Sequence, residues 1–127
     1  MIELLAVIVI IALLAGILTA LYKYAWSKGA DSAAKVEIAA IEDALLRYQQ
    51  QTGTNMVTDN STTGAILLTN LVAQGYLAWT PSRIDTSGLL DLYGTHYRYL
   101  CPGLTNTTSF DVWTTNTTGW IGNFLTQ

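Results

Sequence analysis

The residues that could do chemistry are few in this chain, and the sequence keeps them apart. His96 is the single histidine and Cys101 the single cysteine among 127 residues, so thiolates cannot build a zinc site or an intramolecular disulfide. Glu42 and Asp43 are adjacent carboxylates, but neighbours on a helix point in different directions and make a poor acid–base pair. We expect His96 to be a solvated strand residue and Cys101 a small apolar one. The sequence therefore predicts that the chain is not an enzyme.

The composition also argues against nucleic acid as a partner. The net charge is −3, and the six basic residues are spread without clustering: Lys23, Lys28, Lys35, Arg47, Arg83 and Arg98. Charged residues make up 12% of the chain, whereas an ordinary globular domain carries about a quarter. The mean hydropathy is positive, at +0.31. These values indicate a membrane contact or a large buried interface.

One acid, Glu3, stands directly before a long apolar segment. Residues 4–22 carry no charge, and 19 residues of helix would span about 28 Å, enough to cross a bilayer. Twelve of them are Leu, Ile or Val, which together favour membrane insertion by roughly 4–7 kcal/mol. The basic residues Lys23 and Lys28 follow the segment, and no break separates it from the polar sequence beyond. We therefore expect a retained helix, not a cleaved secretory signal.

The helical pattern continues in amphipathic form beyond the apolar segment. Ile38, Ile41, Leu45 and Tyr48 recur at helical spacing, and Gly53 is a suitable C-terminal cap. The whole helix would hold about 50 residues, far more than an ordinary globular helix. We expect two domains: an apolar half-helix at 1–24, and a globular head at 25–127 that contains the amphipathic half.

The rest of the head predicts one short helix and a C-terminal sheet. Thr63 is a candidate N-cap and Gly75 a terminator for the helix, whose apolar face would be formed by Ile66, Leu67, Leu71 and Val72. Strands are predicted at 110–113 and 120–125, after a turn and a strand that carries alternating tyrosines. The predicted fold class is α+β, with a long N-terminal helix packed on a small antiparallel sheet.

Two sequence signatures resemble one protein superfamily. The string IELLAVIVIIALLAGIL resembles the mature N-terminus of type IV pilins and type II secretion pseudopilins. A turn-and-strand signature resembles that of major pseudopilins and comprises Asp91, Tyr93, Gly94, Tyr97, Tyr99, Pro102 and Gly103. The resemblance implies a pilin fold in which the apolar half-helix protrudes. Two departures stand out: only two residues precede Glu3 where relatives have four, and the proline that kinks many relatives near Ala20 is absent.

The resemblance implies a major structural subunit of a type IV pilus-like filament, with other copies of the chain as its main partner. In the family, the near-terminal glutamate neutralises the amino terminus of a neighbouring subunit, which is commonly methylated. The residues expected to mediate assembly are Glu3, Leu5, Ile8, Ala12, Leu13 and Gly16. A prepilin peptidase, an assembly ATPase and a platform protein are implied, with the inner membrane before assembly and a cell-surface filament after it.

Two other functions stay open on the sequence alone. The first is the major pseudopilin of a type II secretion system, and the second a bitopic membrane protein that carries a binding or sensory module. Major pseudopilins bind calcium near the C-terminus, but here Asn116 and Asn123 have no carboxylate after Asp111 to help them. We therefore expect no cofactor.

The C-terminal quarter is rich in threonine and asparagine. Asn60, Asn106 and Asn116 each open an N-x-S/T sequon, which makes them candidate glycosylation sites on an exposed filament. Chance is an equal explanation, because threonine-rich sequence generates sequons freely.

Overall fold

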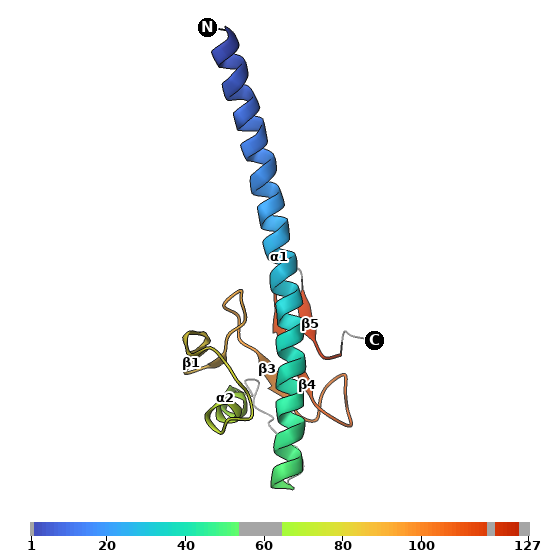
Figure 1. The fold of residues 1–127 in the computed structure, drawn as a ribbon. Coiled ribbons are helices and arrows are strands. Elements are labelled where there is room, and N and C mark those ends of the chain that lie inside the picture. The colour runs from blue at the N-terminus through green and yellow to red at the C-terminus, as the bar shows by residue number, and fades with distance from the viewer. Residues whose placement is uncertain (1, 54–64, 117–118, 125–127) are drawn as a thin grey trace. The chain divides into compact units, whose positions relative to one another are not determined.

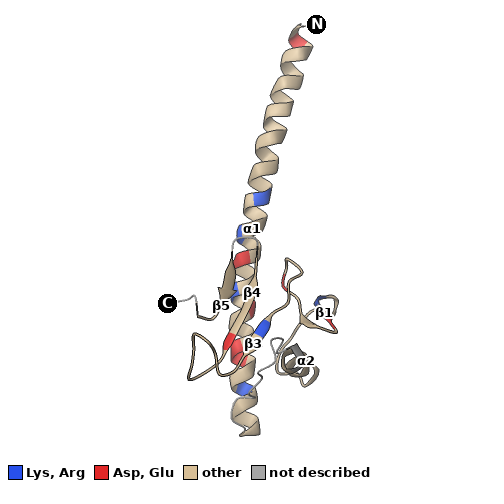
Figure 2. Ribbon diagram, turned by 180° about the vertical axis from the view of Figure 1, so that it is seen from behind, with Lys and Arg blue, Asp and Glu red and all other residues tan. Residues whose placement is uncertain are grey.

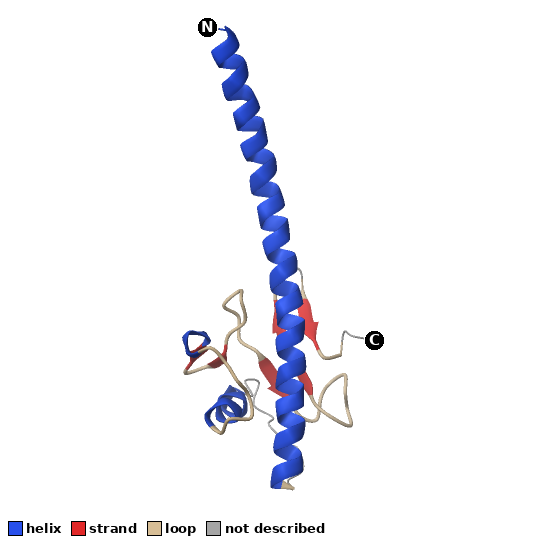
Figure 3. Ribbon diagram, viewed as in Figure 1, coloured by secondary structure: helices blue, strands red, loops and turns tan. Residues whose placement is uncertain are grey.

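The computed structural model describes residues 2–53, 65–116 and 119–124, and its fold class is α+β, as predicted (Figures 1 and 3). Two helices and a 3₁₀ turn are present: α1 (Ile2–Thr52), α2 (Ala65–Ala73) and η1 (Pro81–Arg83). Five short strands follow: β1 (Ile84–Asp85), β2 (Gly88–Leu89), β3 (Arg98–Leu100), β4 (Asp111–Thr115) and β5 (Trp120–Gly122).

Helix α1 has 51 residues and ends where the sequence predicted. Gly53 adopts φ 62°, a left-handed conformation that glycine reaches without steric cost, and its amide donates to the Gln49 carbonyl at 3.0 Å. Neither Gly16 nor Gly29 interrupts the helix. Because no proline removes a backbone donor, the hydrogen-bond ladder continues from the apolar half into the amphipathic half.

The chain divides into two compact units, Met1–Ala30 and Asp31–Gln127. The first unit is the apolar part of α1, and the second holds the rest of α1, α2 and all five strands. The predicted domain boundary at residue 24 rests on where the apolar segment ends, and it stays a prediction.

The second unit has one hydrophobic core. Ile38, Ile41 and Leu45 of α1 are buried and Tyr48 packs against them, as their helical spacing predicted. The helix α2, the strands and the segments that connect them contribute buried side chains to the same core: Leu68, Leu71, Leu77, Leu89, Tyr97, Tyr99, Cys101, Phe110, Val112 and Ile121. The amphipathic half of α1 is therefore fixed to the sheet by burial.

Strand β4 is the centre of a three-stranded antiparallel sheet in the order β3-β4-β5. Tyr99 pairs with Val112 and Thr114 with Ile121, and all four side chains are buried on the core side. The predicted strands were nearly right, but β4 runs to Thr115 and β5 stops at Gly122. The predicted residue Leu125 lies outside the described residues.

A β1–β2 hairpin and the exact face of α2 were not predicted. Each hairpin strand has only two residues, too few for alternation to be visible in the sequence. On α2, Leu68 is fully buried although the prediction omitted it, while Leu71 is buried as expected. Gly75 ends the helix with φ 81°. The predicted cap Thr63 and the side chain of Ile66 lie outside the described parts.

Candidate assembly surface and head network

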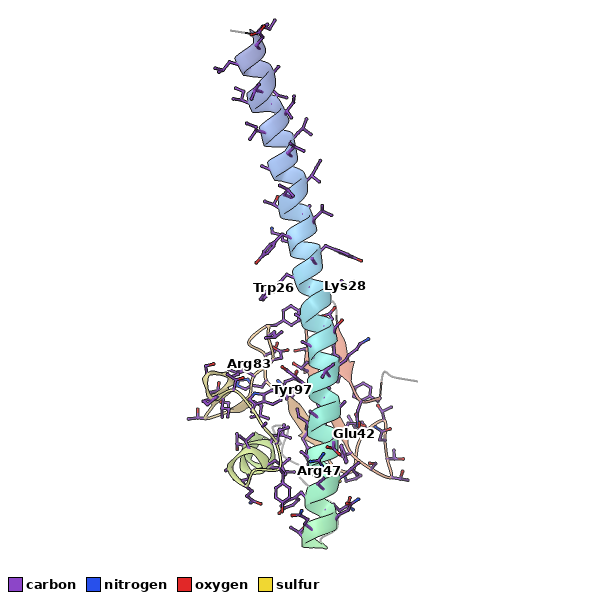
Figure 4. All side chains as sticks on the ribbon, in the orientation of Figure 1. Trp26, Lys28, Glu42, Arg47, Arg83 and Tyr97 are labelled. Atoms are coloured by element: carbon purple, nitrogen blue, oxygen red, sulfur yellow. The ribbon has the colours of Figure 1, made fainter. Side chains whose placement is uncertain are left out.

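The first unit presents apolar side chains on every side of its helix. Each side chain from Ile2 to Trp26 is exposed, and Figure 4 shows them projecting all around the helix. This helix is the one among the described residues that is long and apolar enough to cross a membrane, and none of its most apolar window is buried. A surface that is apolar all round has no polar side to turn to water, so it requires an apolar environment.

Polar groups within this segment are scarce. Figure 2 shows no charged residue on α1 between the acid at its start and the first lysine, Lys23. The Thr19 hydroxyl donates to the Gly16 carbonyl of its own helix at 2.8 Å, so it adds no unmet donor to the segment. The helix can therefore enter a medium without water at little polar cost.

Five of the six residues predicted to mediate assembly lie toward one side of α1, and Glu3 lies on the opposite side. Leu5, Ile8, Ala12 and Gly16 are spaced by three or four residues and lie along one stripe, with Leu13 beside it. The small residues Ala12 and Gly16 sit one turn apart, and a Cβ at Gly16 would meet nothing within 4 Å. This stripe lets another helix backbone approach closely.

Glu3 lies exposed in the first turn of α1. A carboxylate there faces the positive end of the helix dipole, which stabilises its charge. Its predicted partner, the amino terminus of a neighbouring copy, stays a prediction.

A second group of chemistry-bearing residues fixes α1 to the head. The Arg83 guanidinium donates through Nη1 and Nη2 to the two carboxylate oxygens of Glu37, both at 2.7 Å, and the Tyr97 hydroxyl donates to Glu37 at 2.6 Å. Arg83 Nη2 also donates to the Leu90 carbonyl at 2.7 Å. We call Glu37, Arg83 and Tyr97 the head network (Figure 4 labels the last two).

The pKa values of the head network reflect this pairing. Burial alone would raise the pKa of Glu37, but the hydrogen bonds from Arg83 and Tyr97 outweigh it and hold that pKa below its usual value. The hydrogen bonds to Glu37 also raise the pKa of Arg83, while burial followed by the Glu37 carboxylate raises that of Tyr97. All three groups therefore keep their ordinary charge at neutral pH, and the network is a structural clamp.

Trp79 completes the surroundings of Arg83. The guanidinium carbon lies 5.2 Å from the centre of the Trp79 ring, and that ring meets Tyr97 edge-on at 5.5 Å. Among the described residues, buried Arg83 Nε has no hydrogen-bond partner. This cluster was not predicted, because no local sequence pattern links residues 46 positions apart.

Two buried aspartates accept hydrogen bonds from the backbone of a nearby turn or loop. Asp91, expected to set a turn, accepts from the Tyr93 and Thr95 amides at 2.8 Å each and from the buried Thr114 hydroxyl at 2.8 Å. Asp111 accepts from two backbone amides of the loop at 103–110, which closes over it. Both carboxylates are used by the fold. Within 2–53, 65–116 and 119–124, no group of three or more His, Cys, Asp or Glu side chains is placed to hold a metal ion.

The sequon asparagines have structural contacts where they are described. The Asn116 amide donates to Asp31 at 2.6 Å, and its oxygen accepts from the Gly119 amide at 2.7 Å. The Asn106 amide donates to the Phe110 carbonyl at 3.2 Å. Asn60 lies outside the described residues. Glycosylation stays a prediction for all three.

The single histidine has a partner that was not predicted, and its side chain stays 37% exposed, in line with the expected solvated residue. His96 Nε2 lies 2.9 and 3.0 Å from the two Asp85 oxygens, and this contact, followed by the Ser87 amide, holds the pKa of Asp85 below its usual value. Cys101 is buried, as expected, with its thiol directed to the Ser109 carbonyl. Of the adjacent carboxylates, Asp43 pairs with Arg47 on the helix surface.

Comparison with known protein families, curated proteins and solved structures finds no match to this chain. What the fold itself supports is coarser. A long apolar N-terminal helix and a small antiparallel sheet are compatible with a pilin-like fold, and the helix is consistent with a membrane span.

Proposed function

We propose that this chain is a structural subunit of a type IV pilus-like filament, held together by bundled N-terminal helices. The observation that carries the proposal is the apolar helix surface at residues 4–22, exposed on every side and preceded by the acid Glu3. The unassembled subunit would sit in the inner membrane, and assembly would move the apolar segment from lipid into a bundle of identical segments at the filament axis.

The energetics favour this exchange of surroundings. The free energy gained by removing apolar surface from water does not depend on direction. An apolar bundle therefore stabilises the segment as well as lipid does, whereas exposure to water is unfavourable. Tight packing then distinguishes the bundle from lipid, and the small residues Ala12 and Gly16 on one stripe allow it. A carboxylate in such a bundle needs a cationic partner, and the amino terminus of the next copy would supply one for Glu3.

The C-terminal part of the head suits a surface exposed to the medium. Among residues 99–127 the single charge is Asp111, whose carboxylate is buried, so the exposed side chains there are neutral. The exposed side chains among the described residues of this part include Thr105, Thr107 and Thr108, together with the apolar Leu104 and Trp120. Such a coat would hydrate the filament without binding strongly to charged polymers.

The test is a charge placed at the middle of the apolar segment. Leu13→Asp replaces an exposed leucine with an acid that costs roughly 3–4 kcal/mol at the centre of an apolar medium. We expect this variant to be absent from sheared surface filaments while its head stays folded by circular dichroism. Leu13→Met keeps the apolar character, and Gln50→Asp adds the same charge at an exposed position of α1 outside the segment, so both should assemble.

Normal filaments from Leu13→Asp would refute the bundle. Long surface filaments on wild-type cells favour a pilus, whereas lost export of secreted proteins on deletion of the gene would assign the chain to a secretion pseudopilus. A wild-type protein that stays monomeric in membranes and never enters the sheared fraction would instead be a bitopic binding module.

A further inference from the structure

A ring of aromatic and basic side chains follows the apolar segment directly. Tyr22, Tyr24 and Trp26 are exposed by 69%, 66% and 55%, which is unusual for side chains of this size. Lys23 and Lys28 are exposed among them, and the Lys28 ammonium lies 5.9 Å from the centre of the Tyr24 ring. We call these five residues the collar.

The collar encircles the helix. At about 100° per residue, Trp26 lies about 40° and Lys23 about 100° around the axis from Tyr22. Tyr24 and Lys28 lie at about 200° and 240°, on the opposite side. A protein groove would engage one stripe of a helix, whereas a planar boundary that the helix crosses meets all of its sides. The angular distribution therefore favours a membrane surface over a protein partner.

The lengths of the apolar segment and of the collar also fit a lipid bilayer. Residues 4–22 span about 28 Å of helix, close to the roughly 30 Å of a bilayer's hydrocarbon core. The collar continues for a further 9 Å or so along the axis, similar to the headgroup layer on one side of a bilayer. Tyrosine and tryptophan favour that layer, because their rings are apolar and their N–H or O–H groups need polar partners.

The charge of the collar selects the type of lipid. Between Glu3 and Asp31 the two lysines are the only charged residues, so the collar carries a charge of +2 with no acid to offset it. Long lysine side chains reach the headgroup layer from a helix that crosses it. We propose that the collar binds the headgroups of anionic phospholipids and sets the depth of the unassembled subunit in the membrane.

This inference rests on the proposed function in one respect, the residence of the apolar segment in a bilayer before assembly. Assembly would have to release these headgroup contacts. The collar is thus a retention device for subunits that have not yet joined a filament.

The test uses the full-length protein reconstituted in phosphatidylcholine bilayers with a trace of spin-labelled lipid. Electron spin resonance gives the preference of the protein for spin-labelled phosphatidylglycerol over spin-labelled phosphatidylcholine. We expect Lys23→Gln and Lys28→Gln each to lower this preference on the order of fivefold, the equivalent of about 1 kcal/mol per basic residue. Lys35→Gln is the matched control, because Lys35 is exposed on the same helix about 10 Å beyond Lys28.

The aromatic part of the collar has a separate readout. The difference in tryptophan quenching between the wild type and Trp26→Phe reports Trp26 alone. Lipids brominated near the headgroup should quench this difference signal more than lipids brominated near the chain ends.

Three results would each contradict the proposal that the collar binds anionic headgroups. The first is a wild type that shows no preference for anionic lipid, and the second is a Lys35→Gln variant that loses as much of this preference as the collar variants. The third is a Trp26 signal that no brominated lipid quenches. If the wild type forms normal filaments but shows no preference for anionic lipid, the proposed role of the collar is wrong and the proposed function stands. Strong preference in a protein that never forms filaments would defeat the proposed function alone.

Discussion

Removing the charge of Glu37 tests whether the head network fixes α1 to the head. In Glu37→Gln the shape is kept, but one carboxylate oxygen becomes an NH₂ group that faces donors from Arg83 or Tyr97. Hydrogen bonds to a charged group contribute about 1.5–3 kcal/mol each, and the side chains of the ion pair are only 20–22% exposed. With partial compensation by solvent, we expect the free energy of unfolding to fall by about 2–3 kcal/mol.

For a head of about 100 residues this loss lowers the melting temperature by about 8–24 °C. The assay is thermal unfolding of the full-length protein in detergent micelles, followed by near-ultraviolet circular dichroism. Asp43→Asn is the matched control, since it also converts an acid of α1 paired with an arginine, but that pair is 57–62% exposed. It should cost less than about 1 kcal/mol. If Glu37→Gln and Asp43→Asn lower the melting temperature equally, the head network does not stabilise the head more than an exposed ion pair does.

Three further predictions concern the head. Because the folded pKa of Glu37 lies below its ordinary value of 4.5, its stabilisation is complete well above that value and is lost as the pH falls through the folded pKa. The melting temperatures of wild type and Glu37→Gln should therefore converge as the pH is lowered below 4.5. Gly103→Ala should destabilise the head by about 1–3 kcal/mol in urea unfolding, because its Cβ would lie 2.6 Å from a buried carboxyl group. In Gly29→Ala the added Cβ meets nothing within 4 Å, so this substitution should stabilise the helix by up to about 1 kcal/mol. Thr114→Val should cost about 1–3 kcal/mol in the same assay, because it removes the shorter of the two hydroxyl contacts of Asp91 Oδ2, 2.8 Å against 3.2 Å from Thr95; a cost below about 0.5 kcal/mol would contradict that role.

Local signals made the long helix and its core face predictable. The spacing of Ile38, Ile41 and Leu45 repeats with the helical period, and burial of one face follows from that period alone. Gly53 marks the end of the helix because only a residue without a Cβ adopts its conformation cheaply. The apolar segment is recognisable from its composition alone, since it has more apolar side chains than a small head could bury.

Contacts distant in sequence were not predictable in the same way. Glu37 looks like any solvated acid of an amphipathic helix until Arg83, 46 residues later, arrives beside it. The residues between Glu37 and Arg83 bring the two side chains together through packing and turns, and these produce no periodic pattern in the sequence. The partner of His96 was not predictable for the same reason, because Asp85 comes from a hairpin too short to be recognised.

We propose that the apolar segment joins a bundle of identical copies, and helical reconstruction of filaments sheared from the cell surface would reveal such a bundle. We expect this chain to be the repeating unit, with residues 4–22 packed against their copies at the axis. The Glu3 carboxylate should lie within about 4 Å of a neighbour's amino terminus. Filaments built from another protein, with this chain left in the membrane fraction, would contradict this proposal.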